Sequence, residues 1–367
     1  MGASAVINEY QYGDPANSSI LPYTTEIKGE ILWEKESPVI SDPQPLHNIA
    51  IVNNHLVLDY GTVFNTRNRE DGSSSWISSR TRNFRFHVTT DGIFTLNTSG
   101  FLDVISFDKK IVSHLSLPFV NENAVLLYSS INKQEITYCY QRMPEPTSGP
   151  GDRASGPEIR LSRLDIDTRE LKAELIQKGM LRDILFNQQG NFFYIIMENN
   201  LHVISSPSFD SKMNSLSFED IKCGSIDKEG NLLLIAEESD HYFLMCLDRA
   251  SKVIWRYQLE TIPQIPQPPT GLENNKVLFV NGNRLLCLNK EKLEWETDLP
   301  CEWQKIKFSV LSDKSILAAA GQFLFHFSSE GKELRKIILK DSATCRPIVD
   351  EKGRIYVGGS KLITCFK

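Results

Sequence analysis

The chain has 367 residues, of which 41% are hydrophobic and 10% aromatic, so it can bury a sizeable core. A formal net charge of −6 gives no general attraction to nucleic acid or to an anionic membrane surface, and we expect neither as a partner. Seven cysteines without CxxC spacing, and an N-terminus with neither a basic start nor an apolar run, predict a cytoplasmic protein with reduced thiols.

The chain begins with an arm followed by an outer strand. Residues 1–28 are polar and contain Gly, Pro, Asn and Ser, so we expect an N-terminal arm whose removal through residue 25 has a mild effect. The segment GEILWEKE (Gly29–Glu36) then alternates apolar and polar residues around a tryptophan. This pattern is typical of a strand with one buried face, so we expect the folded domain to begin at residue 29.

The rest of the chain repeats a unit of about 40 residues. Each unit has an apolar run, a polar turn, a second run, a tight turn and two further runs, as in Gly224–Glu260 and Pro269–Leu299. Four strands at this period are the signature of a propeller blade, whose strands we label A (innermost) to D (outermost). We count eight units, and because a Pro-, Gly- and Ser-rich insertion at residues 143–157 breaks the third, seven blades is the alternative.

The last unit of the chain stops after strand C. Its missing strand D matches Gly29–Glu36, which resembles the strand D segments Val253–Glu260 and Lys292–Leu299. We therefore predict that Gly29–Glu36 pairs with Lys361–Lys367 and closes the ring, since closure removes the two exposed sheet edges. The predicted fold is a single all-β propeller over residues 29–367.

Recurring tryptophans and turns give the repeat a family likeness. Trp33, Trp255 and Trp295 lie in strand D segments, and Asp-x-x-Gly turns begin at Asp227 and Asp350. With these residues the chain resembles the PQQ-like repeat family of propellers, which includes quinone-dependent dehydrogenases and cofactor-free scaffolds. The adjacent cysteine pair of the dehydrogenases is absent from the sequence, so the resemblance implies a scaffold without a cofactor.

Catalytic and metal-binding motifs are missing from the sequence. There is no G-x-S-x-G, HExxH, P-loop or GxGxxG pattern, and the seven histidines are scattered without metal-ligand spacing. His202 and His326 alternate with apolar residues, which favours packed histidines over ligands. We therefore expect no catalytic residue, metal or cofactor, and a binding module rather than an enzyme. The alternative is a sugar-acting hydrolase or lyase whose site combines single residues of different blades.

The loops that connect strand D to A and strand B to C vary most in length here, and variable loops on a rigid scaffold are where recognition generally lies. Arg82, Arg182 and Arg346 enter strand A of three blades, and Trp303 lies in the same class of loop. We predict that these four residues contact another protein on this face and that the chain is an interaction scaffold. A sensor of a small anionic ligand is the alternative for this basic collar, although acidic residues in the same loops favour its neutralisation.

Overall fold

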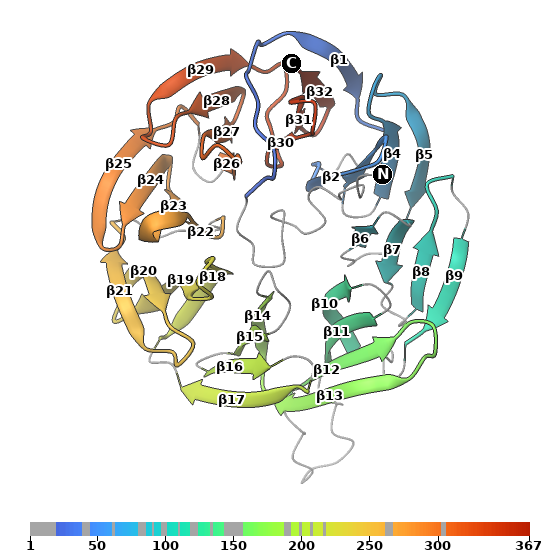
Figure 1. Cartoon of the computed structure of the whole chain (residues 1–367), viewed down its shortest axis with the longest axis vertical. Coiled ribbons are helices and arrows are strands. Elements are labelled where there is room, and N and C mark those ends of the chain that lie inside the picture. Colours follow the sequence, from blue (N-terminus) through green and yellow to red (C-terminus); the bar gives the residue numbers. More distant parts are fainter. Residues whose placement is uncertain are drawn as a thin grey trace, which may run out of the picture. The chain divides into compact units, whose positions relative to one another are not determined.

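The computed structural model describes residues 20–38, 45–60, 63–79, 86–89, 92–96, 101–108, 111–117, 124–132, 135–142, 157–186, 192–197, 200–205, 208–215, 218–260, 267–301 and 306–367. In these residues lie 32 β-strands and one 3-10 turn, η1 (Glu273–Asn275). The strands form eight antiparallel sheets of four strands each, so the fold is an eight-bladed β-propeller (Figure 1). The predicted fold class is confirmed, and the seven-bladed alternative is wrong.

Contacts within the chain define two compact units, which are described separately. The first unit comprises residues 1–80 and 218–367, and the second comprises residues 81–217. The prediction of a single domain over residues 29–367 stays a prediction. Within the part of the chain that the structure describes, no helix is long and apolar enough to cross a membrane.

The first unit holds blades one, five, six, seven and eight. Their strands, in the order A to D, are β2 (Asn48–Val52), β3 (His55–Asp59), β4 (Val63–Asn68) and β5 (Ser74–Ser79); β18 (Asp220–Ile226), β19 (Leu232–Glu238), β20 (His241–Leu247) and β21 (Val253–Gln258); β22 (Thr270–Gly271), β23 (Lys276–Asn281), β24 (Arg284–Asn289) and β25 (Lys292–Asp298); β26 (Ile306–Val310), β27 (Ile316–Ala320), β28 (Phe323–Phe327) and β29 (Glu333–Ile338); β30 (Ile348–Val349), β31 (Ile355–Gly358), β32 (Leu362–Phe366) and β1 (Ile31–Glu36).

The second unit holds blades two, three and four. Their strands, again from A to D, are β6 (Phe86–Thr89), β7 (Gly92–Leu96), β8 (Phe101–Ile105) and β9 (Ile111–Ser116); β10 (Ala124–Asn132), β11 (Glu135–Arg142), β12 (Glu158–Asp165) and β13 (Leu171–Lys178); β14 (Leu181–Phe186), β15 (Phe192–Met197), β16 (Asn200–Ser205) and β17 (Asp210–Ser215). In blade three, Arg142 at the end of strand B lies opposite Glu158 at the start of strand C, which confirms where the insertion enters. Residues 143–156 of that insertion lie outside the described residues.

The run MNSLSFE predicts that strand D of blade four begins at Met213, but in the structure the strand begins three residues earlier, at Asp210. The cause is a tight turn built on Phe209, whose φ of 61° is left-handed and whose N–H donates to the Ser205 carbonyl at 2.9 Å. The Phe209 ring is 4% exposed and packs edge-on against Phe193. Turns with left-handed backbone usually contain Gly, Asn or Asp, so a phenylalanine at this position gives no sequence signal for the turn.

Blade eight is completed by the N-terminal strand, as predicted. Strand β1 pairs antiparallel with β32, with Trp33 opposite Cys365 and Glu36 opposite Leu362. Further backbone bonds extend the ladder at both ends, among them those from the Lys367 N–H to the Glu30 carbonyl at 2.9 Å and from the Ser37 N–H to the Lys361 carbonyl at 2.7 Å. The last strand therefore has no open edge on the side where another chain could pair.

The burial of each strand follows its place in the blade. The five residues of β27, a strand B, are all buried, whereas β25, a strand D, is mostly exposed. Inner strands lie between neighbouring sheets and pack on both faces, which explains their continuous apolar runs. The four cysteines that occur inside such runs are buried free thiols, namely Cys139, Cys246, Cys287 and Cys365.

A tryptophan in strand D fastens one blade to the next in two places in the first unit. The Trp295 indole N–H of blade six donates to the Ser329 carbonyl in the C–D turn of blade seven, at 3.2 Å. Trp33 of blade eight makes the same bond, also at 3.2 Å, to the Arg69 carbonyl in the C–D turn of blade one. These contacts account for the tryptophans at positions 33 and 295.

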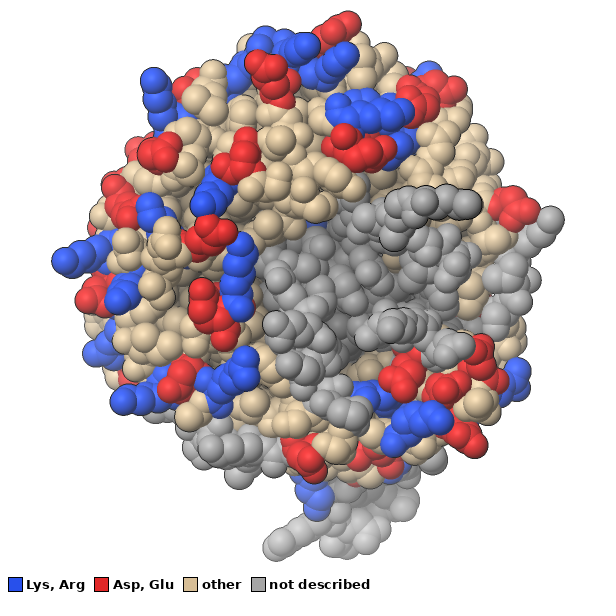
Figure 2. Space-filling view, viewed as in Figure 1, with Lys and Arg blue, Asp and Glu red and all other residues tan. Residues whose placement is uncertain are grey.

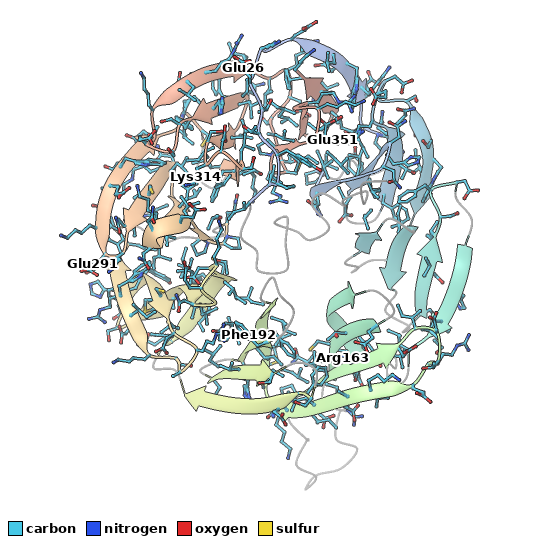
Figure 3. The ribbon with its side chains drawn as sticks, in the orientation of Figure 1. Glu26, Arg163, Phe192, Glu291, Lys314 and Glu351 are labelled. Carbon is cyan, nitrogen blue, oxygen red and sulfur yellow. The ribbon has the colours of Figure 1, made fainter. Side chains whose placement is uncertain are left out.

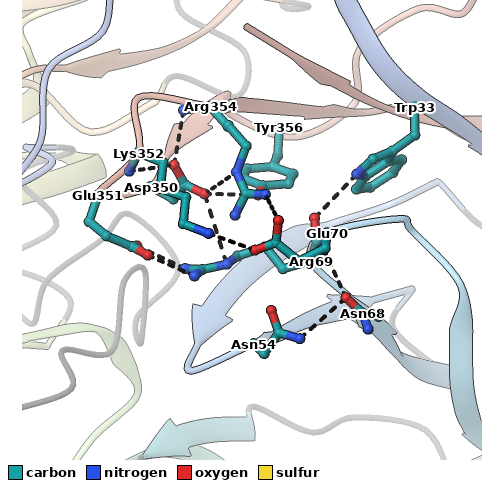
Figure 4. Close-up of polar contacts among 10 residues, drawn as sticks. All are labelled: Trp33, Asn54, Asn68, Arg69, Glu70, Asp350, Glu351, Lys352, Arg354 and Tyr356. Atoms are coloured by element: carbon teal, nitrogen blue, oxygen red, sulfur yellow. Dashed lines mark hydrogen bonds and ion pairs between the residues drawn. The ribbon is translucent and has the colours of Figure 1, made fainter.

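A polar seam joins blades eight and one beside the Trp33 contact (Figure 4). Asp350, fully buried in the A–B turn of blade eight, accepts from the Arg354 Nε at 2.7 Å and from the Tyr356 hydroxyl at 2.9 Å. Glu70, in the C–D turn of blade one, accepts from the Arg354 Nη1 at 2.7 Å and from Lys352 at 2.9 Å. A buried carboxylate and guanidinium are tolerated here because each is hydrogen-bonded and paired.

Candidate functional site

The described part of the predicted arm, residues 20–28, forms a packed strap over blades seven and eight. Ile20 forms a parallel bridge with Val310 at the end of β26, and the Leu21 N–H donates to the Val310 carbonyl at 2.7 Å. The Leu21 side chain is 1% exposed. The Thr25 hydroxyl donates to a backbone carbonyl in the A–B turn of blade eight. The strap is therefore fixed by backbone bonds and by apolar burial before the chain enters β1.

A pocket with a volume of about 450 Å³ opens beside this strap, at the A–B turns of blades six and seven. Volumes of ~300–1,000 Å³ are usual for pockets that hold a ligand or anchoring side chains. Most of its wall is apolar, and Val310 and Leu311 are only 2% and 1% exposed. The apolar lining residues are Ile20, Leu21, Pro22, Leu272, Val310 and Leu311.

Left-handed backbone shapes the pocket rim. In blade six, Asn274 and Asn275 both have φ of 60°, and the Leu272 N–H donates to the Lys276 carbonyl at 2.7 Å. In blade seven, Lys314 has φ of 70° and its N–H donates to the Leu311 carbonyl at 2.9 Å. Asparagine tolerates this conformation better than most residues. These two turns bring charged side chains next to the apolar wall.

Charged side chains rim the pocket. Glu273 lies between two lysines, with Oε2 2.6 Å from the Lys314 Nζ and Oε1 3.3 Å from the Lys228 Nζ. Hydrogen bonds from Lys314 and then Lys228 lower the pKa of Glu273, so it is a carboxylate at neutral pH. Lys276, the third lysine of the rim, pairs with Glu294 of β25 at 2.6 Å. In Figure 3, Lys314 lies nearer the centre of the picture than Glu291, which is in the outer C–D turn of blade six.

The pocket suits binding better than proton transfer. The described residues that line it include neither histidine nor cysteine, and Glu273 is held in its charged form between two ammonium groups. Among the described lining residues, Lys276 is already paired with Glu294, while Lys228 and Lys314 share the single carboxylate of Glu273, so the rim carries a local excess of positive charge although the chain is acidic as a whole. Basic and acidic side chains are interspersed over this face of the blades (Figure 2). A group that is apolar at one end and anionic at the other fits these surroundings.

The structure places one of the four predicted contact residues. Arg346 precedes strand A of blade eight and is 4% exposed. It lies beside Cys345, where burial raises the pKa of the thiol to about 12. Arg82, Trp303 and the side chain of Arg182 lie outside the described residues, so their role stays a prediction.

Other groups of the predicted basic face already have partners. Lys222 pairs with Asp220 at 2.6 Å, and Asp341 accepts the N–H groups of two residues in the B–C turn of blade eight. In the described part of these loops, Asp220 therefore neutralises a lysine and Asp341 caps backbone N–H groups, which agrees with the expected neutralisation of the basic collar. His202 and His326 are 3% and 8% exposed, and burial lowers the pKa of each ring, which confirms that both are packed histidines.

Sequence reasoning missed the pocket although part of its signal is visible. The A–B turns of blades five, seven and eight each contain a lysine, at positions 228, 314 and 352, and strand B of blade six begins with Lys276. Lysines that recur at this end of consecutive blades indicate a basic surface, because equivalent turns lie at the same end of each sheet. Turn geometry alone explains the polar composition of these turns, and the strap that completes the pocket wall has no propeller-repeat signal.

Comparisons with known proteins extend to the fold. No family model matches the sequence, and no curated protein matches it. Among solved structures, the quinohaemoprotein alcohol dehydrogenase ADHIIG from Pseudomonas putida HK5 is similar, with a TM-score of 0.67, 7% identity, and coverage of 97% of this chain and 79% of that one. BamB from Moraxella catarrhalis has a TM-score of 0.59 and 11% identity, over 92% of this chain and 99% of that one.

A europium-containing methanol dehydrogenase gives a TM-score of 0.64 at 10% identity, over 96% of this chain and 90% of its own. At such low identities these likenesses show the fold alone. They bear out the PQQ-like repeat propeller fold that the tryptophans and turns indicated. Activity and partners do not follow from fold likeness, because one fold hosts many functions.

Proposed function

We propose that this chain is a non-enzymatic scaffold that holds another protein at the A–B turns of blades six and seven. The observation that carries this proposal is the apolar pocket between the strap and those turns. Interfaces concentrate their binding free energy in a few large side chains that fill such pockets. A partner that inserts one or two apolar side chains there would be anchored without any change in the propeller.

The wall of the pocket is rigid enough for this role. Val310 belongs to the buried cluster shared by blades six and seven, and Leu272 packs against the same cluster. The strap residue Leu21 belongs to the core cluster of blades seven and eight. A preformed wall spares the partner the entropic cost of ordering it, which favours affinity.

The proposed pocket lies at the opposite end of the strands from the face that the sequence analysis predicts. Substitutions confined to one surface at a time distinguish between the two. Ser312 lines the pocket and is exposed, so Ser312→Trp places a bulky ring there with little effect on the fold. Arg82→Glu with Arg182→Glu tests the other face. Arg346 is unsuitable for such a test, because reversing a side chain that is 4% exposed would bury a carboxylate.

The test is purification of the tagged full chain from its native cells, followed by chemical cross-linking and mass spectrometry. We expect a stoichiometric protein partner cross-linked near Lys228 and Lys314, and lost from the Ser312→Trp variant. Retention of the partner in that variant and its loss on reversal of Arg82 and Arg182 would move the function to the other face. A chain that remains a monomer without partner would contradict the scaffold role. The cytoplasmic location stays a prediction. Fractionation of the same cells into cytosol and membranes checks it.

A further inference from the structure

We propose that Glu273 occupies, in the unbound protein, the seat of a carboxylate that the partner supplies. This inference rests on the proposed function and specifies the chemistry of the partner. The partner segment then combines an apolar anchor for the pocket with an Asp or Glu close to it in sequence. The lysine–glutamate–lysine bridge at the rim, from Lys228 through Glu273 to Lys314, is the observation from which it follows.

The bridge has the geometry of a carboxylate-binding site built from three separate blades. Lys228 comes from the A–B turn of blade five, Glu273 from that of blade six and Lys314 from that of blade seven. Each oxygen of Glu273 contacts a different ammonium group, at 3.3 Å and 2.6 Å. Two ammonium groups held at this separation can accept another carboxylate in the same position, since the contacts are charge-assisted and not specific to the side chain that provides them.

The bridge is also easily exchanged. The side chains of Lys228, Glu273 and Lys314 are 45%, 47% and 57% exposed. Ion pairs in such positions are weak, because water solvates the separated charges almost as well. Glu273 can therefore swing into solvent when another carboxylate arrives, and the apolar anchor rather than the ion pair supplies most of the affinity.

Charge then determines which segments are admitted. Lys276 is already paired with Glu294. Displacement of Glu273 therefore leaves Lys228 and Lys314 for the incoming carboxylate. An acidic segment is attracted to this rim from a distance, whereas a basic one is repelled. The apolar wall adds a second requirement, because a purely acidic segment would leave it exposed to water. An acidic–apolar segment meets both conditions.

The experiment selects random peptides displayed on phage against the immobilised full chain. The strongest binder is then labelled with fluorescein, and its affinity for variants is measured by fluorescence anisotropy. Glu273→Gln removes the internal competitor, Lys228→Gln with Lys314→Gln removes the seat, and Ser312→Trp obstructs the pocket. Lys290→Gln with Lys292→Gln is the matched control, since these exposed lysines lie in and next to the C–D turn of the same blade six. Circular dichroism verifies that each variant is folded.

We expect the selected peptides to share apolar residues flanked by Asp or Glu. Glu273→Gln should tighten binding by about three- to fivefold and loss of both lysines should weaken it by about tenfold, while the control changes nothing. Raising the salt concentration should weaken binding to the parent chain but hardly to the double lysine variant. Tightening by Glu273→Gln is the result that a merely structural bridge would not produce.

The outcomes separate this inference from the proposed function. Peptides that require an open pocket but bind equally well without Lys228 and Lys314 would overturn the carboxylate seat and leave the scaffold role intact. Unchanged or weaker binding to the Glu273→Gln variant would overturn the placeholder role of Glu273. If no selected peptide is sensitive to Ser312→Trp, both the seat and the docking role at this pocket fail.

Discussion

Gly331, in the C–D turn of blade seven, tests how neighbouring blades are joined. Its φ of +77° is left-handed, and a Cβ added there would stand 2.5 Å from the Trp295 Cδ2. Gly353, in the A–B turn of blade eight, has a similar φ of +72°, but the nearest contact of an added Cβ would be at 3.5 Å. The substitutions Gly331→Ala and Gly353→Ala therefore share the backbone strain and differ in the overlap with the indole.

The expected magnitudes follow from these two contributions. Left-handed backbone costs an alanine about 1–2 kcal/mol, so Gly353→Ala should lower the free energy of unfolding by that amount. Overpacking adds about 1–3 kcal/mol, so Gly331→Ala should lower it by about 2–5 kcal/mol. With ~2.1 cal/mol/K of unfolding entropy per residue over 367 residues, 1 kcal/mol corresponds to about 1.3 °C in Tm. The two variants should therefore melt about 1–3 °C and about 3–6 °C below the parent chain.

The assay is thermal melting followed by circular dichroism, repeated in a Trp295→Leu background. Removal of the indole removes the overlap, so Gly331→Ala should then lower Tm only as much as Gly353→Ala does. The difference between the two backgrounds is the coupling between Gly331 and Trp295. Equal losses from Gly331→Ala with and without the indole would refute the contact between strand D and the next C–D turn.

The polar seam and the strap lead to three more expectations. Asp350→Asn removes the buried one of the two carboxylates that pair with Arg354, leaving only the half-exposed Glu70, and should cost about 3–5 kcal/mol in urea denaturation. Asp227→Asn, at the same turn position of blade five, should cost less than half as much, since burial already raises the pKa of Asp227; equal costs would contradict the role of the ion pair. Hydrogen bonds from Lys352 and Arg354 lower the pKa of Glu70 from 4.5 to about 2. The stability it provides is therefore complete above pH 4.5 and lost as the pH falls toward 2, but for so exposed a carboxylate it should stay below about 1 kcal/mol. Melting of Glu70→Gln should accordingly differ from the parent chain at pH 7 and coincide with it near pH 2. Deletion of residues 1–25 removes the buried Leu21, so it should cost about 1.5–3 kcal/mol more than deletion of 1–19, contrary to the mild effect that the sequence suggests. Deletion of 1–36 should cause aggregation, because it also removes β1 from blade eight, and equal melting of all three would contradict the closure.

The repeat made the blades predictable because each blade uses the same local signals. Apolar runs separated by polar turns located the strands, and the match between Gly29–Glu36 and other strand D segments located the closing strand. The errors lie where a tertiary contact decides the conformation. Phe209 forms a turn because its ring packs against Phe193 in the core. Leu21 is buried because the strap pairs with the end of β26. Neither contact has a counterpart in the local pattern.

The candidate site also depends on contacts between distant segments, which the local sequence pattern does not reveal. The lysines of the A–B turns of blades five and seven can be read from the sequence, but the seat for a carboxylate exists only because turns of three blades converge on Glu273. Residue spacing cannot reveal this, since Lys228 and Lys314 are separated by two whole blades of sequence. The apolar half of the site needs the strap as well, which comes from the other end of the chain. A segment that binds here would therefore recognise the assembled blades rather than any one repeat, and loss of the strap should weaken its binding even if the lysines remain in place.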